Sequence, residues 1–309
     1  MEHTRVLAVV TSHGAYDDGK ETGLWLSELS HFYDLLTQAG YAVDIASIKG
    51  GRVPLDPDSV AHARLDASAR DFLESSEKRN MLENTPALTE VQAKNYAAVF
   101  FAGGHGTMWD FKGNPGVQRI ITQVHGSGGI IAAVCHGVAA LVPAIDGEGK
   151  SLIAGRAVTG YSTLEERLIN KRNKVPCLLE SELVAASALY SRAWLPFIPY
   201  AVADGRVVTG QNPQSTKRVG RMVSALLKKP TPAALNNAKC GMCLSGTWFL
   251  GLFAVAWGIV ALFGAAHLMQ SPILAVVVIL AGLGFLRYQY PFRPCVRCVA
   301  AVRTHESLG

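Results

Sequence analysis

The sequence predicts an α/β domain with a doubly wound, mainly parallel sheet, followed by a two-helix transmembrane hairpin. Through the first 227 residues, short apolar runs alternate with segments of helical periodicity. This alternation is typical of a parallel sheet that is covered by helices on both faces. From Cys240 to Leu286 the chain contains no Asp, Glu, Lys or Arg, which is typical of membrane-spanning segments.

Each predicted element of the first domain has a local signal. The strands are continuous runs of apolar residues, and three of them end in glycines. The helices carry apolar residues at helical spacing, and the first is closed by Gly40. Thr89 and Gln92 have the spacing of a capping box. The expected strands are 5–12, 41–47, 96–104, 130–137 and the start of 206–229; the expected helices are 23–40, 116–129, one from 137 onward and the end of 206–229.

The positive charge of the chain is local. The net charge is +5, but residues 228–309 carry seven basic side chains and one acidic one, whereas the first 227 residues carry 22 basic and 23 acidic ones. A basic segment around an apolar stretch indicates a membrane flank, so we expect no nucleic-acid partner. The short apolar run at the N-terminus is not a signal peptide, and we therefore expect the first domain, residues 1–228, in the cytoplasm.

The apolar stretch 244–290 is divided by "QSP" into two predicted spans. Residues 229–243 form a linker, and 244–268 is longer than the about 20 apolar residues that cross a bilayer. Residues 273–290 form a shorter second span, and 291–309 form a basic tail. Because basic residues lie on both outer flanks, we expect a multi-pass membrane protein with its catalytic domain and both termini in the cytoplasm. The alternative, a buried hairpin of a soluble domain, lacks partner sequence to cover it.

Two Cys-x-x-Cys pairs flank this hairpin. One consists of Cys240 and Cys243, and the other of Cys295 and Cys298. Four thiolates are the number that a structural Zn²⁺ binds, and a helical hairpin returns its two ends to one face. A zinc site is therefore one interpretation. A redox dithiol, lipidated cysteines and chance remain alternatives.

A cysteine and a histidine are adjacent in "AAVCHGVAAL". Cys135 lies where a strand ends and a helix begins, and such an elbow exposes a thiol at a helix N-terminus, which lowers its pKa. Two other glycine-rich strand ends, "TSHG" and "AGGHGTMWD", are expected at the same edge of the sheet. Cys135 is therefore a candidate nucleophile. The alternative is a small buried hydrophobe, as most free cysteines are.

Five segments, in order along the chain, carry a resemblance to a known family. They are "GLWLSELSHFYDLLTQAGYAVDIASIKGGRVPLDP", "FFAGGHGTMWDF", "AAVCHGVAAL", "VTGYSTLEE" and "VVTGQNPQS". Together they resemble the ThiJ/PfpI superfamily, and within it the glyoxalase III-like and stress-chaperone branch, over about residues 5–227. The resemblance implies the flavodoxin-like fold of the class I glutamine amidotransferase-like proteins. It does not extend to the apolar stretch.

The resemblance also implies catalytic roles. It assigns the nucleophile to Cys135, the catalytic histidine to His136 and the acid that hydrogen-bonds the thiol to Glu28. The backbone N–H groups of Gly104 and His136 would form an oxyanion site.

The acid that orients His136 is assigned to Glu166, with Glu165 as a near alternative. On this interpretation His136 need not fold back on its own neighbour. His105 lines the pocket, or contributes through its backbone alone.

The function that the resemblance implies is a glutathione-independent glyoxalase. It would convert methylglyoxal or a related 2-oxoaldehyde to a 2-hydroxy acid through a cysteine hemithioacetal, with no metal, nucleotide or glutathione. Alternatives are a cysteine-dependent deglycase or amidohydrolase, a stress chaperone, and a membrane thiol or metal-binding module with a sensor domain. The expected partners are a small reactive aldehyde, the membrane and a second copy of the chain in a homodimer.

Overall fold

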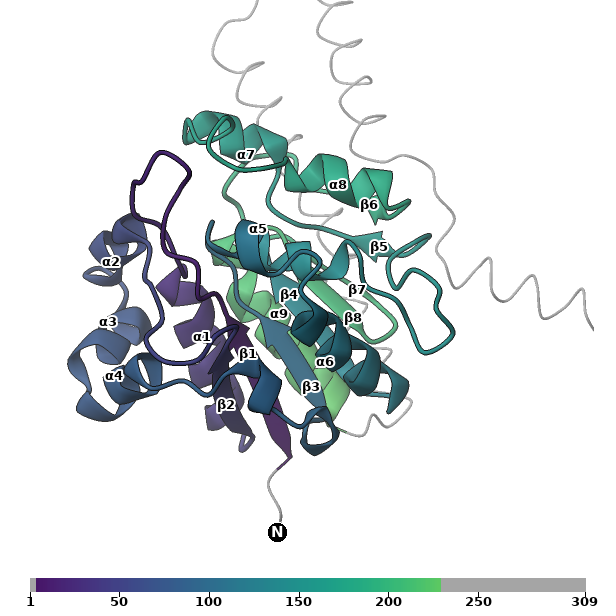
Figure 1. The fold of residues 1–309 in the computed structure, drawn as a ribbon, viewed down its shortest axis with the longest axis horizontal. Coiled ribbons are helices and arrows are strands. Elements are labelled where there is room, and N and C mark those ends of the chain that lie inside the picture. The colour runs from purple at the N-terminus through teal and green to yellow at the C-terminus, as the bar shows by residue number, and fades with distance from the viewer. Residues whose placement is uncertain (1–3, 229–309) are drawn as a thin grey trace, which may run out of the picture. The chain divides into compact units, whose positions relative to one another are not determined.

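The fold is built on a six-stranded sheet, which confirms the predicted mainly parallel α/β architecture (Figure 1). The computed structural model describes residues 4–228. Strand order is β2-β1-β3-β4-β8-β7, and all neighbours pair in parallel except β7 and β8. The strands are β1 (Arg5–Val10), β2 (Ala42–Ser47), β3 (Ala98–Phe101), β4 (Ile130–Val134), β7 (Ala201–Asp204) and β8 (Val207–Gly210).

The central strands consist of continuous apolar runs because both faces of the sheet are covered. Every residue of β3 and β4 is buried, as are Val6–Val10 of β1. Such runs are typical of parallel strands that lie between two helical layers. β4 lies between β3 and β8, near the middle of the sheet. Its carboxyl end therefore lies among the carboxyl ends of the parallel strands, where open α/β folds bind their ligands.

Helices cover both faces of this sheet. α1 and α9 pack on each other and on the sheet, while α6 contacts β3 and β4 and lies in front of them in Figure 1. A two-stranded sheet of β5 (Ala157–Val158) and β6 (Leu189–Tyr190) lies apart from the main sheet. The helices are α1 (Leu26–Gln38), α2 (Pro57–Ala63), α3 (Ala67–Glu74), α4 (Ser76–Glu83), α5 (Thr107–Asp110), α6 (Pro115–Gly126), α7 (Thr163–Leu168), α8 (Leu179–Ala185) and α9 (Thr216–Leu227).

Three short helices between residues 57 and 83 were not expected from the periodicity. Each is too short for a clear apolar stripe, but each begins with a side-chain cap, from Asp56, Asp66 and Ser75 in turn. The capping box expected at Thr89 is absent, since two short 3₁₀ turns occupy this stretch without a side-chain cap. The edge strand β7 was also missed, because its four residues are only partly buried.

The predicted membrane localisation is corrected. None of the helices within residues 4–228 has the length and apolarity that a bilayer span requires. The longest of them, α1, has 13 residues, which corresponds to about 20 Å against a hydrocarbon core of roughly 30 Å. The two spans proposed at 244–268 and 273–290 lie outside the described residues, and the multi-pass assignment is not retained.

Several other expectations also fall outside the described residues. They are the linker 229–243, the tail 291–309 and the zinc ligands Cys240, Cys243, Cys295 and Cys298. The domain boundary at residue 228 stays a prediction.

Glycine at position 137 lets the segment after β4 approach the end of β3. A Cβ built on Gly137 would lie 2.4 Å from the carbonyl oxygen of Phe101 and 2.9 Å from the carbonyl carbon of Ala102. Both are backbone atoms, which cannot swing away as the end of a flexible side chain can. Any larger residue must therefore push this segment and its neighbours apart.

We expect Gly137→Ala to lower the free energy of unfolding by about 1–3 kcal/mol, the usual cost of overpacking. Thermal unfolding followed by circular dichroism measures this change. Gly147→Ala is the matched control, because a Cβ at Gly147 meets no atom within 4 Å. An equal thermal midpoint for the two variants would contradict the argument.

Candidate active site

Cys135 lies at a strained elbow on the carboxyl edge of the sheet. β4 ends at Val134, and Cys135 begins a 3₁₀ helix, η3 (Cys135–Leu141). Its φ of +56° lies in the left-handed region that non-glycine residues rarely adopt. Strained residues of this kind are concentrated at functional sites. The predicted elbow is therefore present, although the helix after it is 3₁₀ rather than α.

His136 contacts the thiol directly, contrary to the expectation that it need not fold back on its neighbour. Its Nδ1 atom lies 3.4 Å from Cys135 Sγ, and both side chains are buried. Adjacent side chains usually diverge, but the positive φ of Cys135 changes the course of the chain between the two residues. The histidine is thereby within reach of the thiol proton.

Glu166 accepts a hydrogen bond from the other ring nitrogen of His136. The distance from His136 Nε2 to Glu166 Oε2 is 2.8 Å. Burial alone would raise the pKa of Glu166, but the charge of His136 and the hydrogen bonds from both histidines outweigh it and hold this pKa well below its ordinary value. Glu166 is therefore a carboxylate, which can only accept. Nε2 of His136 must therefore carry a hydrogen, and in the neutral ring Nδ1 is the acceptor that faces Cys135.

His105 donates to the second oxygen of the same carboxylate. Its Nε2 lies 2.9 Å from Glu166 Oε1, and its ring lies 4.2 Å from that of His136. Burial, together with the nearby charge of His136, lowers the pKa of His105 to about 4, so this ring is neutral near pH 7. The side chain of His105 thus has a specific partner in Glu166, and its place in the substrate pocket stays a prediction.

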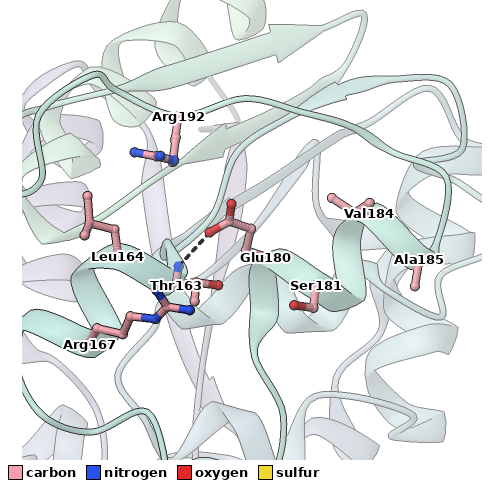
Figure 2. Close-up of a pocket in the computed structure, with 8 residues that line it drawn as sticks. All are labelled: Thr163, Leu164, Arg167, Glu180, Ser181, Val184, Ala185 and Arg192. Atoms are coloured by element: carbon pink, nitrogen blue, oxygen red, sulfur yellow. Dashed lines mark hydrogen bonds between the residues drawn. The ribbon is translucent and has the colours of Figure 1, made fainter.

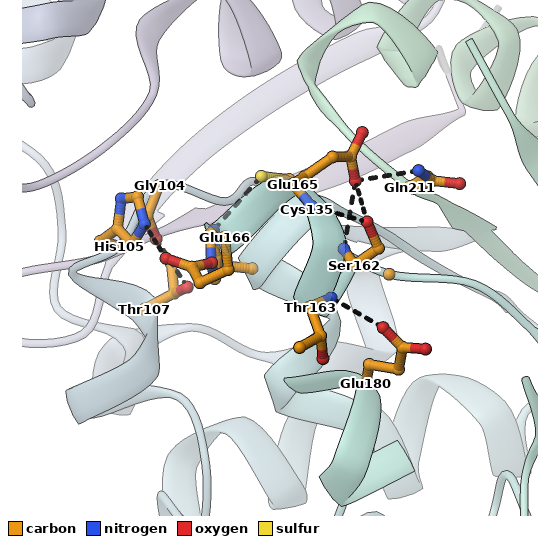
Figure 3. Close-up of polar contacts among 12 residues, drawn as sticks. Gly104, His105, Thr107, Cys135, Ser162, Thr163, Glu165, Glu166, Glu180 and Gln211 are labelled. Atoms are coloured by element: carbon orange, nitrogen blue, oxygen red, sulfur yellow. Dashed lines mark hydrogen bonds and ion pairs between the residues drawn. The ribbon is translucent and has the colours of Figure 1, made fainter. Parts of the chain in front are cut away.

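The two neighbouring glutamates point in different directions (Figure 3). Glu166 faces His105, whereas Glu165 faces Ser162 and Gln211. Glu165 forms a capping box with Ser162 at the start of α7 and fixes the helix that carries Glu166. Glu165 accepts hydrogen bonds from Ser162, Gln211, Asn212 and the backbone N–H of Phe197. The geometry thus favours Glu166 over the alternative.

Glu28 enters the site from α1. Phe32, one turn later on the same face, stacks on Phe100 of β3 with ring centroids 3.8 Å apart, so this face of the helix is buried. Glu28 Oε2 accepts the backbone N–H of Gly103 at 2.6 Å. Burial raises the pKa of Glu28 to about 8, so the acid is mostly protonated at neutral pH. The same side chain shares a hydrogen bond with the thiol of Cys135, which acts against this rise in pKa, as the backbone N–H of Gly103 does.

The thiol of Cys135 is protonated in the resting site. Burial, followed by the adjacent Glu28, raises its pKa above the ordinary value, while the backbone N–H of His136 acts in the opposite direction. The expected lowering of this pKa by the elbow is therefore wrong, since the site is drier than an exposed helix N-terminus. A buried thiol of this kind needs a base, and His136 Nδ1 is in place for that role.

Gly104 occupies a position that only glycine fits. Its φ is +105°, and a Cβ there would lie 2.2 Å from the carbonyl oxygen of Gly23. Within the described part of the chain its N–H has no acceptor among the backbone and side-chain hydrogen bonds. The oxyanion role that the resemblance implies for this N–H stays a prediction.

Tyr161 is the site residue that sequence reasoning missed. Its ring lies 4.5 Å from that of His136, and its backbone N–H donates to the carbonyl oxygen of Cys135 at 3.4 Å. The available signal was its position directly before "STLEE", the segment that supplies Glu166.

His105, His136 and Glu166 are also the group of described residues that could hold a metal ion. One ligand atom from each lies within 4.8 Å of the others. Both histidines already donate to the carboxylate through Nε2, and Nδ1 of His105 stays buried without a hydrogen-bond partner among the described residues.

A surface hollow of about 640 Å³ lies apart from the thiol, on α7 and α8 (Figure 2). Glu180 closes one side of it by accepting the backbone N–H of Thr163 at 2.7 Å. None of the residues around Cys135 lines it. The lining residues are Thr163, Leu164, Arg167, Glu180, Ser181, Val184, Ala185 and Arg192.

Comparison with known proteins agrees with this geometry. The DJ-1/PfpI family model matches residues 21–225. "Glyoxalase 3" of Candida albicans is 32% identical over 230 residues, covering 72% of this chain and 97% of the relative. "Glutathione-independent glyoxalase HSP31" of Saccharomyces cerevisiae is 32% identical over 236 residues, covering 73% and 99%.

Among solved structures, Rapid Encystment Protein 24 KDa of Francisella tularensis is similar to this chain. The TM-score is 0.69 at 40% identity, and the match covers 72% of this chain and 97% of that one. The residues that the family model matches include Glu28, Cys135 and Glu166. The chain belongs to the DJ-1/PfpI family.

Proposed function

We propose that this protein is a glutathione-independent glyoxalase that converts methylglyoxal or a related 2-oxoaldehyde to a 2-hydroxy acid. The observation that carries the proposal is the buried chain of contacts from Cys135 through His136 to Glu166, with distances of 3.4 and 2.8 Å. Such a chain activates a thiol as a nucleophile. The names of the curated relatives support the reaction class.

The first step is addition of the thiol to the aldehyde. His136 Nδ1 takes the thiol proton, and the sulfur of Cys135 bonds to the aldehyde carbon while the carbonyl electron pair moves to oxygen. The N–H groups of Gly104 and His136 hold that oxygen as it becomes negative. His136 then returns the proton to it, which gives a neutral hemithioacetal. Glu166 stabilises the intermediate imidazolium.

The second step moves protons between the two carbons. His136 removes the C1 proton, and protonated Glu28 donates to the C2 carbonyl oxygen, so an enediol forms. His136 then returns its proton to C2, and the Glu28 carboxylate takes the proton from the C1 oxygen. C1 is oxidised to a thioester and C2 is reduced to an alcohol, so the redox change is internal. General acid–base steps of this kind contribute roughly 10²–10⁴-fold in rate.

Hydrolysis of the thioester completes the cycle. His136 takes a proton from the attacking water as the water oxygen bonds to C1, the carbon–sulfur bond breaks, and His136 passes that proton to the sulfur, which restores the thiol and releases lactic acid when the substrate is methylglyoxal. These steps use side chains and water alone, so we expect no cofactor in the reaction. A zinc ion at the cysteine pairs beyond residue 239 and a homodimer stay predictions.

We expect Cys135→Ser to lower lactate production from methylglyoxal, without glutathione, by roughly 10³-fold or more, as loss of a nucleophile does elsewhere. Lactate release by the full chain measures this. Cys177→Ser is the matched control, because that half-buried thiol is the other cysteine of the described residues and forms no disulfide. Wild-type turnover by Cys135→Ser would contradict the mechanism, and inactive wild-type protein would contradict the proposed function.

We expect His105→Leu to reduce kcat by about 10–100-fold, which corresponds to the roughly 1.5–3 kcal/mol of a hydrogen bond to a charged group. Leucine leaves Oε1 of buried Glu166 without its donor. His105→Gln keeps an N–H donor and should recover part of the activity. If glutamine and leucine gave equal losses, the hydrogen bond would not be the cause.

We expect Glu28 to produce an alkaline loss of activity centred near pH 8. The folded-state pKa of Glu28 is raised above its ordinary value of 4.5 to about 8, so the neutral acid that donates to the substrate disappears as the pH rises through 8. The same shift makes its contribution to stability most favourable below pH 4.5 and progressively less favourable up to pH 8. Glu28→Gln should therefore weaken the decrease in thermal midpoint between pH 5 and 8. An unchanged decrease would refute this assignment.

A further inference from the structure

Tyr161 is held beside the nucleophile by both its backbone and its ring. It lies between β5 and α7, and its N–H donates to the carbonyl oxygen of Cys135 at 3.4 Å. Its ring is tilted by 34° on the ring of His136 at 4.5 Å and meets that of His105 edge-on at 6.4 Å. Two of the three rings in this column already contact Glu166, so the position of the phenol is fixed by the catalytic group.

The hydroxyl of Tyr161 has no hydrogen-bond partner within residues 4–228. Three other tyrosine hydroxyls have partners: Tyr190 donates to Gly160, Tyr200 to Ser191 and Tyr41 to Ser224. Tyr161 is 7% exposed, against 3% for Cys135 and 2% for His136, and its oxygen is not among the fully buried polar atoms that lack a partner. The hydroxyl is therefore at the accessible side of the site.

The chemical state of this hydroxyl is also fixed. Burial, and then the neighbouring acidic groups of Cys135 and Glu166, raise the pKa of Tyr161 far above its ordinary value. The group is therefore an O–H near neutral pH and can donate a hydrogen bond.

The proposed reaction requires donors at two oxygens of the substrate. The sulfur fixes C1, and the backbone N–H groups of Gly104 and His136 are assigned to the oxygen on C1. The oxygen on C2 becomes negative when the C1 proton leaves, and protonated Glu28 supplies one donor to it. A carbonyl oxygen has two lone pairs and accepts a second donor.

We propose that Tyr161 is a catalytic residue whose hydroxyl donates a hydrogen bond to the C2 oxygen of the 2-oxoaldehyde and of its enediol. A tyrosine hydroxyl together with a neutral carboxylic acid is an established arrangement for stabilising an enolate oxygen. The inference rests on the proposed glyoxalase function. It also gives a reason for preference for 2-oxoaldehydes over simple aldehydes, which have no C2 oxygen for Tyr161 and Glu28 to bind.

The test compares Tyr161→Phe with wild type as the full chain. Phenylalanine keeps the ring that packs on His136 and removes only the hydroxyl. We expect kcat for lactate formation from methylglyoxal to fall by about 10²-fold, the size of effect seen when one oxyanion donor is removed. With methylglyoxal deuterated at C1, the kinetic isotope effect should increase, because enediol formation becomes more fully rate-limiting.

Two further measurements separate this role from a structural one. Alkylation of Cys135 by iodoacetamide forms no enediol, so its rate should be the same in Tyr161→Phe and wild type. Thermal unfolding should also be unchanged. Tyr41→Phe is the matched control, since it loses a hydroxyl that donates to the backbone of Ser224 and should keep full activity.

Three outcomes would overturn the inference. The first is a wild-type kcat in Tyr161→Phe. The second is a fall in the alkylation rate of Cys135 as large as the fall in kcat, and the third is an unchanged isotope effect. Each of these leaves the glyoxalase function intact if the wild-type chain forms lactate. Absence of lactate formation by wild type removes the proposed function itself, so the two failures are distinguishable.

Discussion

The site depends on one buried carboxylate, Glu166, which is held between two histidine N–H groups. A buried charge is costly unless its oxygens are paired, and here each oxygen has its own donor, at 2.8 Å from His136 and 2.9 Å from His105. The pairing decides the tautomer of both rings. Because His136 donates through Nε2, its Nδ1 lone pair faces the thiol. The reactivity of Cys135 therefore depends on a carboxylate that it does not touch.

The surrounding structure holds this carboxylate in place. Glu165, the preceding residue, binds side chains and backbone from several loops and anchors α7 at its first turn. On the other side of the thiol, the stacking of Phe32 on Phe100 fixes the buried face of α1 and with it Glu28. The two acids next to the reacting groups thus have opposite states: Glu166 is ionised because it is paired, and Glu28 is neutral because it is buried with one N–H donor. Pairs of carboxyl groups with such divergent pKa values are typical of acid–base catalysis.

Much of the domain could be predicted, because its main signals are local. Continuous apolar runs predict β1, β3 and β4, and helical spacing predicts α1, α6 and α9. The motifs also predict that Cys135, His136, Glu28 and Glu166 meet at one edge. The contact between His136 and Cys135 could not be predicted, because it follows from a single positive φ angle. The raised pKa of the thiol follows from burial, and Tyr161 from the packing of three rings, neither of which is visible in a sequence. The membrane assignment rested on the apolar composition beyond residue 240. No helix of the described residues supports that assignment.

The central claim is that Glu166 fixes both histidines as Nε2–H tautomers and leaves Nδ1 of His136 free to act on the thiol. Nitrogen-15 NMR of histidine-labelled protein reports this directly, since protonated and unprotonated ring nitrogens have widely separated chemical shifts. Near pH 7 we predict Nε2–H and unprotonated Nδ1 for His105 and His136 in the resting enzyme, and collapse of the His136 pattern in Glu166→Gln. A resting His136 that carries its proton on Nδ1 would contradict the account, because that ring could not accept the proton of Cys135.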